Sequence, residues 1–117
     1  MTKLYFFIAF LSVNLLSFGQ STSVSIDSLN TYLNDAYIYG EKSDYLNAIV
    51  SGKKLLELSY KQNDSTYIAE AYYVLGYIDE VIEEYEQAEE KYNKALEIIE
   101  KKQDSVFLVD IYNGLAN

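Results

Sequence analysis

The densest group of side chains that could do chemistry is a run of acidic residues in the second half of the chain. Seven of the twelve residues from 79 to 90 are acidic: Asp79, Glu80, Glu83, Glu84, Glu86, Glu89 and Glu90. Carboxylates at this spacing could hold a cation, receive a basic partner, or act as an acid–base pair in a desolvated cleft. A calcium loop also needs a Gly at a fixed position on an irregular loop, and none fits here. We interpret the run as a solvated face and predict no metal site in it.

The residue types that are missing from the chain exclude most common catalytic mechanisms. The chain has no His and no Cys, and all nine of its basic residues are Lys. It therefore lacks the side chain best suited to proton transfer near neutral pH, a thiolate for zinc, and the bidentate grip of Arg. Asp64-Ser65 and Asp104-Ser105 offer a serine hydroxyl but no base to activate it, so we interpret both pairs as helix caps. We predict no catalytic residue and no cofactor, and we do not expect an enzyme.

The charge balance restricts the partners. Asp and Glu number 18 against nine Lys, which gives a net charge of −9. Nucleic-acid binding needs a basic footprint, and anionic lipid attracts clusters of Lys and Arg. We therefore expect this segment to bind no nucleic acid and not to dock on anionic lipid through its charge.

The first twenty residues have the pattern of an export signal. Lys3 is the only charged residue, an apolar stretch follows from Leu4 to Leu16, and the small residues Ser17 and Gly19 precede Gln20. A charged start, a short apolar stretch and a small-residue cleavage site are typical of a signal peptide. We predict a signal over 1–19, a polar lead over 20–28, export to the periplasm or medium, and no membrane contact after cleavage. The alternative is an uncleaved anchor, although the stretch is shorter than the roughly 20 residues that span a bilayer.

The rest of the chain repeats with a period of 40 residues. When 44–77 is laid over 84–117 without a gap, ten of the 34 pairs are identical, among them Tyr45/Tyr85, Ala48/Ala88 and Tyr72/Tyr112. A fixed period in this range is the signature of a stacked array of structural units. The array predicts the fold class and favours binding over catalysis.

Apolar residues within each unit are spaced by three and four, which indicates helices. Polar clusters at 40–44 and 62–65 separate the helical stretches. The pattern predicts helices at about 28–40, 44–62, 66–82, 84–102 and 105–117. Because the connections are only two to four residues long, neighbouring helices must run antiparallel.

The residues from 72 to 95 carry a family resemblance. Aromatic and small residues occur there in a fixed order: Tyr72, Leu75, Gly76, Tyr85, Ala88, Tyr92 and Ala95. This order resembles the tetratricopeptide repeat (TPR), a helix-turn-helix unit with small residues where its two helices touch. The resemblance implies an all-α fold of antiparallel helix pairs stacked as an α-solenoid, with units at about 29–64, 65–104 and a truncated 105–117. The period of 40 exceeds the family's 34, and Glu100 replaces the usual Pro.

Tyr is unusually frequent, with 13 residues. Those at helical spacing are expected in the core with their hydroxyls at the surface: Tyr72, Tyr85, Tyr92 and Tyr112. Gly76 and Ala88 are expected to let two helix backbones approach, with Tyr72 and Tyr92 filling the space around them.

The resemblance also implies a binding groove. In TPR proteins the first helix of each pair lines a concave surface, and the non-core face of those helices here presents Leu33, Tyr37, Glu70, Tyr73, Tyr77, Glu80, Asn113 and Asn117. An aromatic groove with Asn and Glu suits a protein or peptide ligand. A groove without a ligand in this segment is the alternative, since fold does not fix function.

The sequence stops inside the first helix of the third unit. Arrays of this kind generally need three or more units and a cap, so we expect an N-terminal part of a longer protein. Resemblance to exported repeat arrays of Bacteroidetes-like bacteria implies the periplasmic sensory region of a signalling protein with a histidine kinase or DNA-binding output. The alternative is a self-contained secreted scaffold that self-associates through its uncapped C-terminal end.

Overall fold

A computed structural model describes residues 25–102 and 105–116 of the chain. The predicted signal peptide, most of the polar lead, the Asp104 cap and the groove position Asn117 lie outside the described residues. No helix in the described part is both long and apolar enough to cross a membrane.

The described residues form five α-helices and no strand. The helices are α2 (Ile26–Glu41), α3 (Tyr45–Lys61), α4 (Ser65–Val81), α5 (Tyr85–Lys102) and α6 (Ser105–Ala116). The predicted all-α class is confirmed, and every helix boundary lies within two residues of its predicted position.

The three turns between α2 and α5 end the preceding helix in the same way. In the first turn the amide of Ser43 donates to the Gly40 carbonyl and that of Asp44 to the Tyr39 carbonyl, and the same pair of bonds recurs 20 and 40 residues later. This is the Schellman arrangement, which satisfies carbonyls at the helix end. Its left-handed position, with φ of 61°, 53° and 66°, is filled by Ser43, Asn63 and Glu83. A side chain at such a position costs conformational energy, which Gly would avoid.

The residue after each left-handed position starts the next helix. Asp64 accepts hydrogen bonds from the amides of Thr66 and Tyr67, at 3.1 and 3.2 Å, and Asp44 accepts one from the amide of Asn47 at 3.4 Å. The predicted cap at Asp64 is confirmed. Because one residue both closes the ending helix and caps the next, each turn needs only three residues.

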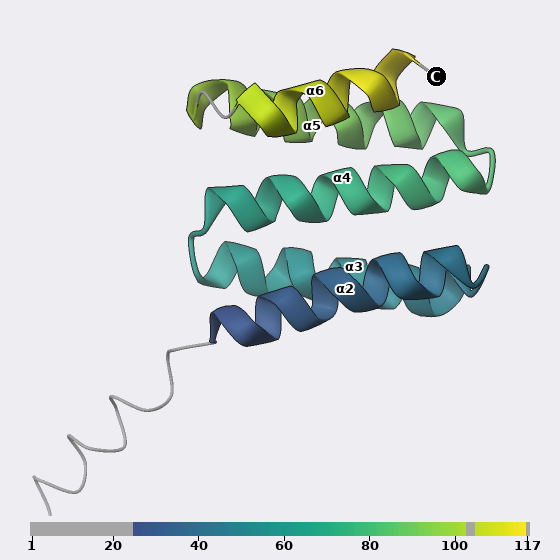
Figure 1. The fold of residues 1–117 in the computed structure, drawn as a ribbon, viewed down its shortest axis with the longest axis horizontal. Coiled ribbons are helices and arrows are strands. Elements are labelled where there is room, and N and C mark those ends of the chain that lie inside the picture. The colour runs from purple at the N-terminus through teal and green to yellow at the C-terminus, as the bar shows by residue number, and fades with distance from the viewer. Residues whose placement is uncertain (1–24, 103–104, 117) are drawn as a thin grey trace, which may run out of the picture.

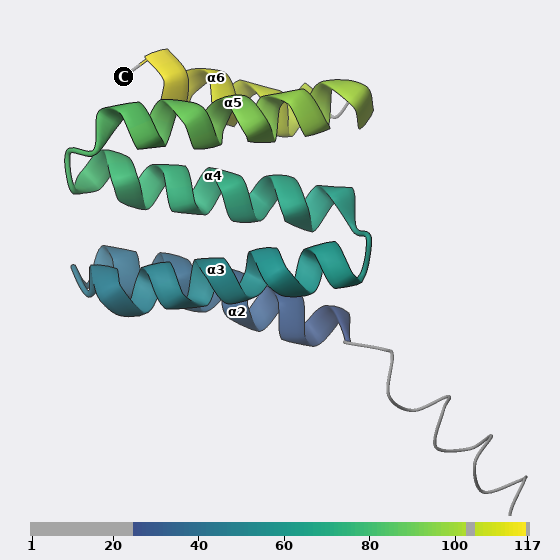
Figure 2. The same cartoon turned by 180° about the vertical axis from the view of Figure 1, so that it is seen from behind.

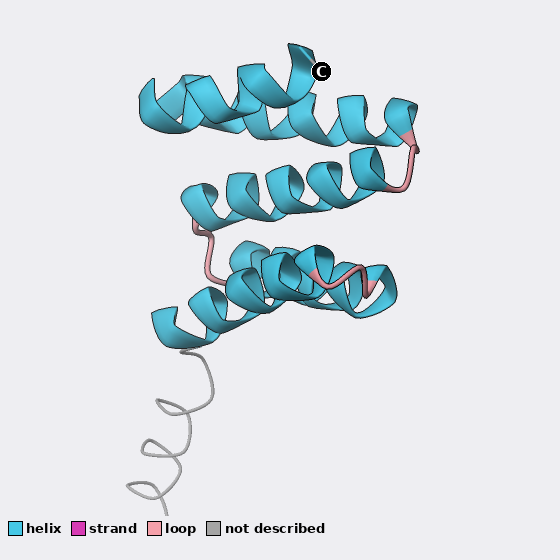
Figure 3. Cartoon of the chain, turned by 45° about the vertical axis from the view of Figure 1, so that its right-hand side comes forward, coloured by secondary structure: helices cyan, strands magenta, loops and turns pink. Residues whose placement is uncertain are grey.

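Such short turns make successive helices antiparallel. α2 lies in front of α3 and α6 in front of α5, with α4 between the two pairs (Figure 1). From behind, α3 and α5 are foremost (Figure 2), and the turns connect alternate ends of the stack (Figure 3). Each helix packs on the next along the chain, and α2 also contacts α4.

The core runs through α4, which contributes to all three buried clusters. Ala69 packs with residues of α5 and α6, Ala71 packs with Leu29 and Leu55, and Val74 packs with α2 and α3 residues. Within the described residues every buried side-chain nitrogen and oxygen has a hydrogen-bond partner. Because α4 packs into all three clusters, its orientation is set, and so is the direction of its remaining side chains.

Close helix contacts depend on small residues, as predicted for Gly76 and Ala88. A Cβ added to Gly76 would lie 3.0 Å from the Tyr92 ring and 3.3 Å from the Ala88 carbonyl oxygen. Tyr92 is 2 % exposed, which confirms its place in the core. The prediction for two other tyrosines is wrong, since Tyr85 is 61 % and Tyr112 51 % exposed. Tyr85 is the first residue of α5 and therefore lies at the edge of the stack.

Candidate functional site

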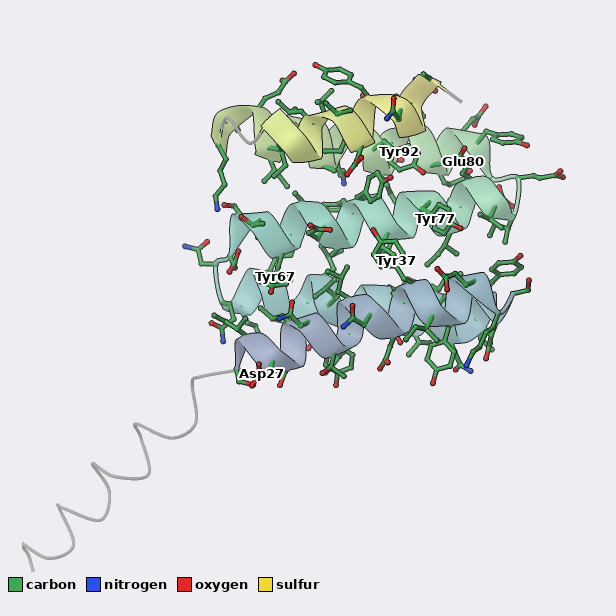
Figure 4. The ribbon with its side chains drawn as sticks, viewed as in Figure 1. Asp27, Tyr37, Tyr67, Tyr77, Glu80 and Tyr92 are labelled. Carbon is green, nitrogen blue, oxygen red and sulfur yellow. The ribbon has the colours of Figure 1, made fainter. Side chains whose placement is uncertain are left out.

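One face of the molecule collects tyrosine rings from three helices. Tyr37 of α2 and Tyr77 of α4 have ring centroids 6.3 Å apart, and Tyr73 of α4 lies 5.5 Å from Tyr92 of α5. Tyr37 and Tyr77 lie beside each other between α2 and α4, and Tyr92 and Glu80 lie farther up on the same viewed side (Figure 4). The spacing along α4 explains this stripe, because positions separated by three and four residues share one helix face.

We define the tyrosine face as five residues of α2 and α4: Tyr37, Glu70, Tyr73, Tyr77 and Glu80. All five belong to the predicted groove set, and all are half-buried. Partial burial leaves each side chain both held by its neighbours and open on one side. Side chains that are already held in place lose little conformational entropy when a partner binds.

The other three predicted groove positions differ. Leu33 is half-buried but packs against two clusters of the core. Asn113 of α6 is exposed. Asn117 is not described. The structure therefore concentrates the predicted groove on α2 and α4.

Acidic side chains surround the tyrosine rings. Burial raises the pKa of Tyr37 above its usual range, and the charges of Glu70 and Asp110 raise it further. Burial also raises the pKa of Tyr73, to which Asp110, Glu80 and Glu70 add. Since Glu70 and Glu80 come from α4 and Asp110 from α6, two helices bring negative charge to the same rings.

Tyr92 links this face to the core. Its hydroxyl donates a 2.7 Å hydrogen bond to Glu80, and burial followed by that bond raises the pKa of Tyr92 above its usual range. The two residues are 12 apart in sequence and face each other across the α4–α5 turn. The bond fixes the Glu80 carboxylate at the upper end of the tyrosine face.

The acidic run divides into two groups. Asp79 and Glu80 are half-buried and engaged, Asp79 in an ion pair with Lys91 and Glu80 with Tyr92. The other five are exposed, as the solvated-face interpretation predicts: Glu83, Glu84, Glu86, Glu89 and Glu90.

A hollow of about 190 Å³ opens where α4, α5 and α6 meet. It is lined by Glu80 of α4, by Tyr85, Ala88, Glu89 and Tyr92 of α5, and by Gly114 and Leu115 of α6. Two carboxylates and two aromatic rings thus share one concave site. Its volume is below the roughly 300–1,000 Å³ typical of small-molecule pockets, so the hollow matches a single side chain better than a whole ligand.

Several of these residues were not predicted as site residues. Glu89 was assigned to a solvated face, Tyr85 and Tyr92 to the core, and Asp110 to no role. The spacing of Tyr85, Ala88, Glu89 and Tyr92 does place them on one face of α5. Which face of α5 meets α6 depends on tertiary packing, so the period alone could not select them.

Within residues 25–102 and 105–116, no group of three or more His, Cys, Asp or Glu side chains could hold a metal ion. In the site, the hydroxyl of Tyr92 binds the carboxylate of Glu80.

No family model matches this chain, and neither the comparison with curated proteins nor that with solved structures found a match. The resemblance to TPR proteins therefore stays a prediction from the sequence.

Proposed function

We propose that the chain is a non-enzymatic module of an exported protein that binds a protein or peptide segment on its tyrosine face. The observation that carries this proposal is the set of half-buried tyrosines on α2 and α4: Tyr37 and Tyr77, whose ring centroids lie 6.3 Å apart, and Tyr73, which lies four residues before Tyr77 on α4. Tyrosine supplies a large amphipathic contact area and has few rotatable bonds to immobilise, and it is enriched at binding hot spots.

The proposal includes a TPR-like α-solenoid, which the repetition of details supports. Tyr72 and Tyr60 pair their hydroxyls at 2.9 Å, and 40 residues later the hydroxyl of Tyr112 donates to Glu100 at 3.1 Å. Equivalent positions of two successive helix pairs thus make equivalent links. In a stacked array of this kind, alternate helices line a continuous surface that suits extended partners.

Export is part of the same proposal and has its own test. The residues before Gln20 have the signal-peptide pattern, and their removal would leave the helical region intact. Intact-mass measurement of the protein recovered from the periplasm of an expressing bacterium should give a chain that begins at Gln20. A chain that keeps Met1 and sediments with membranes would favour the uncleaved anchor.

Peptide selection tests the binding function. A display library of random linear peptides is selected on the protein, and enriched peptides are titrated against Tyr77→Ser and against the control Tyr60→Ser. Tyr60 is 53 % exposed on α3, away from the tyrosine face, so its loss should leave affinity unchanged. Tyr77→Ser should weaken binding at least tenfold, the effect of losing a hot-spot side chain. No enrichment, or equal binding by both variants, would overturn the proposal.

A second candidate is the self-associating scaffold. Val109 and Tyr112 on α6 are 57 % and 51 % exposed, and such apolar side chains could pair two copies. Sedimentation velocity over a wide concentration range distinguishes the two candidates. Growth in mass that Val109→Asp abolishes would favour the scaffold, and a constant monomer would exclude it.

A further inference from the structure

The Lys residues of the helices are confined to two of them, whereas acidic residues occur on all five. α2, α4 and α6 together carry seven acidic residues and no Lys, whereas the Lys residues of the described helices all belong to α3 and α5. Seven Lys residues lie on those two helices: Lys53, Lys54, Lys61, Lys91, Lys94, Lys101 and Lys102. Of these, Lys91 is held by Asp79. α2 and α4, which form the tyrosine face, therefore contribute acidic side chains and no Lys to it.

The hollow where α4, α5 and α6 meet continues this face. Tyr73, Tyr77 and Glu80 follow one another at spacings of four and three along α4. Glu80 forms part of the wall of the hollow, so a segment lying along the tyrosine face reaches it. Glu80 thus belongs to both the tyrosine face and the hollow.

The lining of the hollow is complementary to a cationic side chain. Tyr85 offers an exposed aromatic ring, whose face attracts a cation, and Leu115 offers apolar contact to an aliphatic stem; the buried ring of Tyr92 forms part of the floor. Glu80 and Glu89 offer carboxylates. A carboxylate accepts more than one hydrogen bond, so Glu80 retains capacity for a second donor while it holds Tyr92.

We propose that the partner segment is basic, and that one of its Arg or Lys side chains occupies the hollow between Tyr85, Tyr92, Glu80 and Glu89. This inference rests on the proposed function, because it names the chemistry of the segment that the tyrosine face binds. Glu80, fixed by the Tyr92 hydroxyl, orients the cationic group, and Glu89 closes the outer side.

The test uses peptides enriched on the protein from the random library. Enriched peptides should contain a Lys or Arg at a common position. Replacement of that residue by citrulline, which keeps the shape of Arg and removes its charge, should lower affinity about tenfold, the worth of a charge-assisted hydrogen bond. Affinity is measured by fluorescence anisotropy with a labelled peptide.

Two protein variants locate the effect. Glu80→Gln keeps an oxygen that accepts from Tyr92, and Glu89→Gln changes an exposed side chain, so both should fold. Each should weaken the Arg peptide about tenfold and leave the citrulline peptide unchanged. Glu97→Gln is the matched control: it removes one charge from α5 at a residue paired with Lys101, away from the hollow, and should have no effect.

The outcomes separate this inference from the proposed function. Enriched peptides that depend on Tyr77 but contain no basic residue would overturn the inference and leave the proposed function standing. An equal loss of affinity in Glu97→Gln would mean non-specific attraction to an acidic protein and would also overturn it. No enrichment at all would overturn both.

Discussion

At the scale of single residues, Tyr92 joins the core to the candidate site. Its ring is buried beneath Gly76 and Gly114, and its hydroxyl reaches Glu80 on the tyrosine face. The same side chain therefore supports the packing of three helices and positions a carboxylate. A buried aromatic with a polar tip commonly serves both purposes.

We expect Tyr92→Phe to lower the free energy of unfolding by about 1–2 kcal/mol, because it keeps the ring and removes one hydrogen bond to a charged group. Urea unfolding followed by circular dichroism measures the change. Tyr72→Phe is the control, since its hydroxyl pairs with the exposed Tyr60, and it should cost clearly less. Equal losses in the two variants would contradict the role given to the Tyr92–Glu80 bond.

Tyrosine ionisation should make the protein sensitive to alkali. The pKa of Tyr72 is raised to about 12 by burial and by its hydrogen bond with Tyr60, and burial raises the pKa of Tyr37 and Tyr92 above their usual 10.0. A proton held more tightly in the folded chain contributes stability that is complete below the unfolded pKa of about 10 and is lost as pH rises through the folded pKa.

Urea unfolding at a series of pH values from 9 to 12 should therefore show a falling free energy of unfolding above about pH 10. The absorbance of tyrosinate should rise at a higher pH in the folded protein than in the protein unfolded by urea. A free energy that stays constant over this range would show that these tyrosines are not held as described.

At the scale of elements, the turns repeat a motif whose residues are not equally suited to it. Asn tolerates a left-handed backbone, whereas Glu gains nothing there. Glu83 has φ 66° and belongs to an exposed group of acidic residues. The third turn therefore holds a left-handed backbone without the tolerance that Asn63 gives the second.

Glu83→Gly should stabilise the protein by about 0.5–1 kcal/mol, since Gly adopts the left-handed conformation without strain. Thermal unfolding by calorimetry measures the gain. Glu83→Gln separates backbone from charge, because it removes the carboxylate and keeps the Cβ. If Gln stabilised as much as Gly, relief of acidic repulsion would be the cause, and the strain argument would be wrong.

At the scale of the whole molecule, helix packing depends on where a backbone must come close to a neighbouring side chain. A Cβ at Gly40 would meet only the Tyr77 ring at 3.8 Å, an ordinary contact, whereas at Gly76 it would meet a ring and a carbonyl at 3.0 and 3.3 Å. A close contact thus explains why position 76 is Gly, whereas no contact of this kind is found at Gly40.

Opposite effects should follow from the same substitution. Gly40→Ala should stabilise by up to about 1 kcal/mol through helix propensity. Gly76→Ala should destabilise by about 1 kcal/mol or more, because overpacking against Tyr92 and the Ala88 backbone outweighs the propensity gain. Chemical denaturation of both variants tests this, and stabilisation by Gly76→Ala would show that α4 and α5 can move apart at little cost.

The sequence predicted the helices well because their bounds depend on local features: the spacing of apolar residues and the polar clusters between helices. The resemblance placed the five tyrosine-face residues in a groove; the structure leaves all five half-buried, and their role in binding stays a prediction. The sequence misjudged Tyr85, which has the direction of Ala88 and Tyr92 but lies at the end of α5 and is exposed. Helical spacing predicts which way a side chain points, whereas how deeply the side chain is buried depends on the neighbouring helices.

The position of Asp110 and the presence of the hollow could not be predicted from the sequence for a related reason. Their place depends on how α6 lies against α4 and α5, and that contact comes from side chains distant in sequence. The Glu80–Tyr92 bond likewise spans a turn whose geometry had first to be known.

The shared residue in each turn has a further consequence for how the chain tolerates change in length. Since Asp64 closes α3 and caps α4, no spare residue exists between them to absorb an insertion. One extra residue between positions 62 and 64 would have to be taken up by α4, where each residue turns the helix by about 100°. The stripe of Tyr73, Tyr77 and Glu80 would then rotate away from Tyr37. Length in these turns is thus as constrained as residue type, and natural variation should accumulate as substitutions rather than as insertions.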